Sequence, residues 1–148
     1  MSKNRIFTLG ILGLLIGLTC GLFGCGKKGW PEPILDKERF VWSEISTTVQ
    51  GKCLDITALL SGNVQNLTRL TLEVEMRPEP CPGCPFSPTT TVRMDSGSEL
   101  WERRGALVHV QWCGLEQDMA IRWRLIGHSS HTSMADVPSR VYSLQSEK

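Results

Sequence analysis

The residues of this chain with the most recognisable chemistry are its cysteines, which number 6 in 148 residues. Two of them form the sequence Cys81-Pro82-Gly83-Cys84, a spacing found in redox-active pairs and in metal sites with thiolate ligands. The surrounding prolines disfavour the helix N-terminus that activates a redox thiol, and Pro85 stands where covalent haem attachment requires histidine. Three alternatives remain for this pair: a structural disulfide, a redox centre, or half of a metal site.

A second candidate group lies in a polar segment near the C-terminus. His128, His131 and Asp136 are residue types used in catalytic triads and in metal sites, and the two histidines could complete a metal site with Cys81 and Cys84. The alternative interpretation is a polar connection between two strands. No Gly-x-Ser-x-Gly, phosphate-binding loop or His-Glu-x-x-His pattern is present, so we expect no catalytic residues, no cofactor and no bound metal.

Length and charge narrow the classes of protein further. A chain of 148 residues suits one domain of ordinary size. With Lys+Arg 16 against Asp+Glu 15, the formal net charge is +1, which gives no electrostatic indication of a nucleic-acid partner. We therefore expect no binding to nucleic acid.

The first residues have the three parts of a secretory signal. Lys3 and Arg5 precede an apolar stretch, 6–23, which contains no acidic residue and ends at small residues and a cysteine. This stretch is marginally long enough to span a bilayer, so the alternative is a retained membrane anchor.

The sequence Leu22-Phe23-Gly24-Cys25 resembles the lipobox of bacterial lipoproteins. The resemblance implies a signal peptide at 1–24, cleavage after Gly24 and lipidation of Cys25, although Phe23 is bulkier than is usual there. Cys20 follows Thr19 and has no comparable box around it. Gly26, in place of aspartate, implies an outer-membrane anchor, with the domain in the periplasm or at the cell surface.

The residues after Cys25 extend this resemblance. The start Cys-Gly-Lys-Lys-Gly, followed by Pro31, is similar to that of small envelope lipoproteins, one of which is linked to lipopolysaccharide assembly. It implies, as an alternative function, an accessory factor in lipopolysaccharide or outer-membrane assembly. Pro31 and Pro33 favour an extended tether, so we expect a lipidated N-terminus and tether at 25–39 and a folded domain at 40–148.

Apolar and polar residues alternate through most of this domain, which is typical of half-buried strands. Turn residues separate the alternating segments, and we expect 98–104 to form at most a single helical turn. Strands that are apolar on one side must bury that side against a second sheet, so the pattern predicts an all-β antiparallel sandwich of seven strands. The expected strands are 40–49, 54–60, 70–76, 89–94, 106–112, 119–125 and 140–144.

The segments Ile121–Gly127 and Asp136–Val141 resemble the last hairpin of a fibronectin type III domain or a related immunoglobulin-like domain. The chain has a single tyrosine, Tyr142, so the tyrosine corner of these folds is absent. An oxidising periplasm favours disulfides among the four cysteines after Cys25. The second and fifth strands of the resembled fold are neighbours, which implies the pairs Cys53–Cys113 and Cys81–Cys84.

The remaining side chains indicate surfaces. Trp112 and Trp123 are expected in the core, whereas Trp101 is the tryptophan to test for stacking on sugars. Charged side chains on two adjacent strands are expected to form exposed cross-strand pairs: Glu73, Glu75, Arg77, Arg122 and Arg124.

Together these features predict an outer-membrane lipoprotein, anchored to the membrane at Cys25, whose non-enzymatic β-sandwich contacts an envelope protein or a surface glycan. The alternative from another class is a periplasmic redox or metal-handling lipoprotein that uses Cys81 and Cys84.

Overall fold

The computed structural model describes residues 35–144, which belong to one compact unit that begins at Ile34. The expected signal peptide, Cys25 and most of the expected tether lie outside the described residues. In the described part, no helix is long and apolar enough to cross a membrane.

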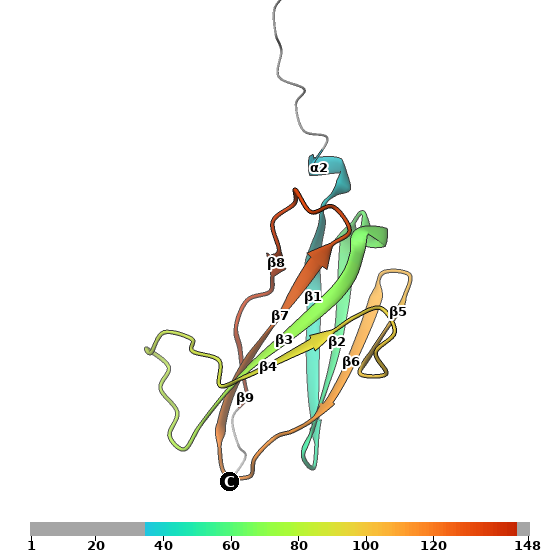
Figure 1. Cartoon of the computed structure of the whole chain (residues 1–148). Coiled ribbons are helices and arrows are strands. Elements are labelled where there is room, and N and C mark those ends of the chain that lie inside the picture. The colour runs from blue at the N-terminus through green and yellow to red at the C-terminus, as the bar shows by residue number, and fades with distance from the viewer. Residues whose placement is uncertain (1–34, 145–148) are drawn as a thin grey trace, which may run out of the picture. The chain divides into compact units, whose positions relative to one another are not determined.

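More than half of the described residues lie in antiparallel strands, and most of the others form turns and loops (Figure 1). A short helix α2 (Leu35–Glu38) precedes the first strand, and a 3-10 turn η1 (Val64–Asn66) separates the second from the third. The strands are β1 (Phe40–Gln50), β2 (Cys53–Gly62), β3 (Leu67–Arg77), β4 (Thr90–Met94), β5 (Trp101–Arg104), β6 (Leu107–Cys113), β7 (Ala120–Ser129), β8 (Val137–Pro138) and β9 (Tyr142–Leu144).

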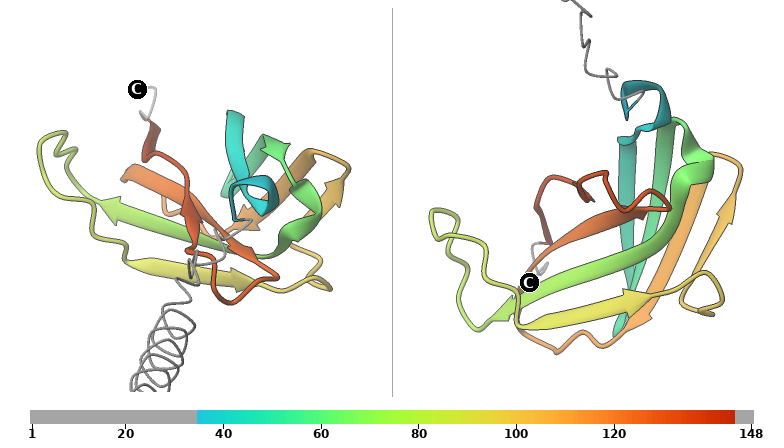
Figure 2. Two further views of the ribbon diagram at one scale, coloured as in Figure 1. Left: turned by 90° about the horizontal axis from the view of Figure 1, so that it is seen from above. Right: turned by 45° about the horizontal axis from the view of Figure 1, so that its top comes forward.

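These strands form two sheets that face each other, as the turned views show (Figure 2). The first sheet has the order β1-β2-β6-β5. The second has the order β4-β3-β7-β8, with β9 also pairing with β7. The predicted all-β antiparallel sandwich is therefore confirmed.

All seven expected strands are present, but the predicted number was wrong because two short strands are added. β8 has 2 residues and β5 has 4, too few for alternation to mark them. The expected helical turn at 98–104 was also wrong in part. Trp101–Arg104 instead pairs with β6 across a turn at Gly105, whose φ of 63° favours glycine.

The core follows the predicted alternation. Leu54, Ile56 and Val110 of the first sheet face Leu72 and Trp123 of the second, and all five side chains are fully buried. The Trp123 ring stacks on the Tyr142 ring with centroids 4.8 Å apart, so the last strand is packed onto the sheet by an aromatic contact. Trp112 is half-buried at the margin of this core.

One glycine is required where β2 passes the start of β1. Gly62 has a φ of 82°, and a Cβ atom there would lie 2.3 Å from the carbonyl oxygen of Arg39. The next residue, Asn63, donates its backbone N–H to that same oxygen at 3.0 Å. The close approach of the two backbones fixes how the chain leaves the first sheet to enter the second.

Candidate functional site

The two predicted disulfides are both confirmed. Cys53 at the start of β2 lies directly opposite Cys113 at the end of β6, with Cα atoms 3.9 Å apart. Their neighbours Leu54 and Trp112 point inward, so this disulfide lies on the outer side of the first sheet, as the alternation predicted.

The second disulfide, Cys81–Cys84, lies in the connection between β3 and β4. The backbone N–H of Cys84 donates to the carbonyl oxygen of Cys81 at 3.2 Å, which closes a tight turn within the disulfide ring. We call residues 78–89 the disulfide loop.

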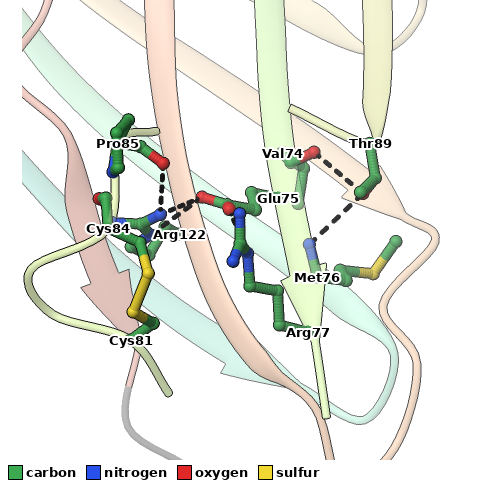
Figure 3. Close-up of polar contacts among 9 residues, drawn as sticks. All are labelled: Val74, Glu75, Met76, Arg77, Cys81, Cys84, Pro85, Thr89 and Arg122. Atoms are coloured by element: carbon green, nitrogen blue, oxygen red, sulfur yellow. Dashed lines mark hydrogen bonds and ion pairs between the residues drawn. A yellow bond between two sulfur atoms is a disulfide. The ribbon is translucent and has the colours of Figure 1, made fainter. Parts of the chain in front are cut away.

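Arg122, on the outward side of β7, binds the disulfide loop to the second sheet (Figure 3). Its Nη1 donates to the carbonyl oxygen of Cys84 at 2.8 Å, and its Nη2 donates to that of Pro85 at 3.1 Å. Its Nε and Nη2 also contact Oε2 of Glu75 at 2.8 Å and 2.6 Å. Each nitrogen of this guanidinium therefore has an acceptor within the protein.

Glu75 is the buried centre of this arrangement. Its side chain is 1% exposed, Arg122 binds its Oε2, and Nε of Arg77 donates to its Oε1. Burial raises the pKa of the Glu75 carboxyl. Hydrogen bonds from Arg122, Arg77 and the backbone of Ser87, together with the charge of Arg122, lower this pKa, and their combined effect is larger than that of burial. The net pKa lies below its usual value, so the carboxylate stays ionised at neutral pH.

A second ion pair and an aromatic ring extend the cluster along the strands. Arg124 Nε donates to Oε2 of Glu73 at 2.6 Å, in the register that pairs these residues across β3 and β7. The Phe86 ring of the disulfide loop lies beneath both guanidinium groups, 5.1 Å from that of Arg124 and 5.9 Å from that of Arg122.

The predicted pairing of these charges is confirmed, but their predicted exposure was wrong for Glu75. The disulfide loop folds over the outer face of the second sheet and removes the carboxylate from water. At the other end of the loop, Thr89 donates its backbone N–H to Val74 at 2.9 Å, and its hydroxyl accepts from the N–H of Met76 at 3.2 Å. The loop is thus bound to β7 at its middle and to β3 at its last residue.

The sulfur atoms of Cys81 and Cys84 are bonded to each other. The carbonyl oxygens of Cys84 and of the next residue, Pro85, both accept hydrogen bonds from Arg122. Within 35–144, no three His, Cys, Asp or Glu side chains are grouped as metal ligands.

The histidine segment separates into two unconnected parts. His128 Nδ1 lies 2.8 Å from Asp136 Oδ1, and its Nε2 lies 2.8 Å from the hydroxyl of Thr71. His131 instead approaches Glu38, at 4.0 Å. The chain of contacts has the order of a catalytic triad, but Thr71 is mid-strand and only 7% exposed, so it links the β7–β8 connection to the sheet.

Trp101 is also used internally. It lies in β5, packs against the core and donates its indole N–H to the carbonyl oxygen of Asp95 at 2.8 Å. Stacking of a sugar on Trp101 stays a prediction. Comparison of the sequence with protein-family models and with curated proteins gives no match.

Replacing Arg122 tests the cluster. We expect Arg122→Met to lower the free energy of unfolding by about 3 kcal/mol, because it leaves the buried Glu75 carboxylate with one partner fewer. Arg124→Met is the matched control on the same strand and should lower it by about 1 kcal/mol, because the Glu73–Arg124 pair is more exposed. Urea unfolding measures both values. Equal losses would contradict the claim that the burial of Glu75 makes the loss of Arg122 more costly than the loss of Arg124.

The lowered pKa of Glu75 predicts a pH dependence. A carboxyl whose folded pKa is depressed stabilises the fold above its unfolded pKa, and this contribution is lost as the pH falls below the ordinary value of 4.5. We therefore expect the free energy of unfolding to drop between about pH 5 and about pH 3 more steeply in the parent than in Glu75→Gln. Parallel pH profiles from urea unfolding would show that this carboxyl does not carry the effect.

Proposed function

We propose that the chain is an envelope lipoprotein, anchored in the outer membrane at Cys25, whose β-sandwich is a non-enzymatic module for contact with a protein or a surface glycan. The observation that carries this proposal is the pairing of all four cysteines after Cys25 in disulfides. Such bonds persist in oxidising compartments and are rare in the bacterial cytosol, which supports export. The lipobox-like sequence then supplies the anchor.

The arrangement of the strands supports an immunoglobulin-like domain of the fibronectin type III kind. Taken in chain order, the sheet β1-β2-β6-β5 corresponds to strands A, B, E and D of immunoglobulin-like domains. The sheet β4-β3-β7, with β8 and β9 at its edge, corresponds to C, F and G with one strand added beside C. Domains of this architecture are common in cell-surface proteins, and the buried charges described above serve the scaffold, which favours binding over catalysis.

The anchor is tested by substitution of the cysteine. We expect Cys25→Ala to remain unprocessed and to lose lipid, so that its intact mass includes the signal sequence and no acyl chains. Cys20→Ala is the matched control and should be processed and lipidated like the parent. Intact-mass spectrometry of the membrane fraction distinguishes these outcomes, and normal processing of Cys25→Ala would refute the lipid anchor.

The contact function is tested by crosslinking of the lipidated protein in its native envelope, followed by mass spectrometry. Crosslinks from the sandwich to one recurrent protein or glycan would support the proposal. Crosslinks that are the same for the folded protein and for a reduced, unfolded sample would contradict it.

A further inference from the structure

A concave surface runs beside β1, away from the charged cluster. It has a volume of about 810 Å³ and lies between β1, the outer side of β2 and β6, and the segment from β8 to β9. We call this surface the edge groove. Trp42 and Ile45 of β1, Leu59 of β2 and Tyr142 of β9 line it, and Trp42 crosses it to donate its indole N–H to Val137 at 2.9 Å.

Some of the exposed hydrophobic residues of the domain lie together along the edge groove. Six large hydrophobic residues of the described chain are exposed, and three of them line it: Val41 (46% exposed), Leu59 (38%) and Leu107 (43%). These side chains give a bound segment apolar surface to contact on one side of the groove.

The backbone beside this hollow is available for pairing. β1 is an edge strand, and in residues 35–144 it pairs only with β2 (Figure 1). The backbone N–H of Leu60 donates to the carbonyl oxygen of Ala106, directly before β6, so Leu60 directs its backbone groups away from β1. Trp42, which lies opposite Leu60, therefore directs its own backbone groups away from β2.

The same alternation holds further along β1. The short Cα distance of 3.9 Å between Cys53 and Cys113 marks a pair without hydrogen bonds to each other, so Cys53 turns its backbone towards Gln50 on β1. The side to which the backbone groups point alternates along a strand. Because Gln50 directs its groups to β2, Thr47 and Ile45, which lie three and five residues before it, direct their N–H and C=O groups to the free edge.

The lining of the edge groove includes one acidic and one basic residue, Glu44 and Arg140. Glu44 is exposed, and none of the ion pairs found among residues 35–144 includes it. Arg140, the other charged residue of the lining, lies over the Tyr142 ring at 4.8 Å. A carboxylate without an ion-pair partner among residues 35–144 is complementary to a basic side chain of a bound segment.

We propose that the edge groove binds an extended segment of a partner protein, which adds to the free edge of β1 as a further strand. Its alternate apolar side chains lie on Trp42 and Ile45, which face the core side of the first sheet, and a lysine or arginine faces Glu44. This inference rests on the proposed function as a contact module and names the chemistry of its partner.

Two substitutions separate strand addition from general adhesion. Thr47→Pro removes an N–H that faces the free edge and places a ring there, while the bonds from β1 to β2 are kept. Glu44→Lys reverses the charge of the rim. Glu99→Lys, at an exposed turn before β5, is the matched control for the change of charge.

The experiment pans a display library of random nonapeptides on the full chain in detergent micelles, then measures binding of the recovered peptides by fluorescence anisotropy. We expect recovered sequences that alternate apolar and polar residues and carry lysine or arginine. Thr47→Pro should weaken their binding at least tenfold and Glu44→Lys several-fold, whereas Glu99→Lys should leave it unchanged. The thermal midpoint and circular dichroism show whether Thr47→Pro is folded. If it is not folded, the test depends on the comparison of peptide binding by Glu44→Lys with peptide binding by Glu99→Lys.

Three results would overturn the inference. The first is recovery of no peptide, and the second is recovery of peptides that bind Glu44→Lys and Thr47→Pro as tightly as the parent. The third is a dimer of the parent that Thr47→Pro converts to a monomer, because a second copy of the chain would then be the occupant. Peptides bound elsewhere would leave the contact function standing while removing this site. Loss of the lipid anchor is measured separately with Cys25→Ala, so failure of that proposal is distinguishable.

Discussion

The burial of one carboxylate, Glu75, governs how the outer side of the second sheet is organised. A charged group that is 1% exposed requires partners for both of its oxygens, because an uncompensated buried charge is strongly unfavourable. Arg122 and Arg77 supply these partners, and Arg122 also holds two carbonyl oxygens of the disulfide loop. Each component thus depends on the others: the loop excludes water from the ion pair, and the ion pair fixes the arginine that binds the loop.

This constraint divides the surface of the domain into two parts. The outer face of the second sheet is occupied by the disulfide loop, and the nitrogens of Arg122 and the ring of Phe86 are used within it. The groove beside β1 differs from this face. It has exposed apolar side chains, the carboxylate of Glu44 and a strand edge that no other strand among residues 35–144 pairs with. The polar network and the open strand edge therefore lie on different parts of the domain.

Much of the fold could be predicted because alternation reports directly on which side chains face the core. The run from Leu70 to Met76 and the run from Ile121 to Leu125 are long enough for their period to be unambiguous, and they became β3 and β7. The pairing of Cys53 with Cys113 was implied by the resembled fold, in which the second and fifth strands are neighbours, and it agrees with the same alternation. β8, with only 2 residues, is defined by its bonds to β7 and has no period of its own.

The burial of Glu75 could not be predicted from its strand, because alternation assigns it to the outer side and gives no information on what covers that side. The covering segment contains Pro85 and Phe86, and a single aromatic residue among prolines after a disulfide ring was the available signal. Its direction over the sheet depends on the bonds from Arg122, far away in sequence. The edge groove was missed for a similar reason, since Val41, Leu59 and Leu107 come from three strands and meet only in the folded sheet.

The most direct test of this account is a double-mutant cycle between Glu75 and Arg122, measured with the Cys81–Cys84 disulfide present and with both cysteines changed to serine. With the disulfide present, the account predicts a coupling energy of about 2 kcal/mol between Glu75→Gln and Arg122→Met. Without it, the loop no longer shields the pair, and the coupling should fall below about 1 kcal/mol, as for an exposed ion pair. The same coupling in both backgrounds would contradict the claim that the disulfide loop shields this ion pair.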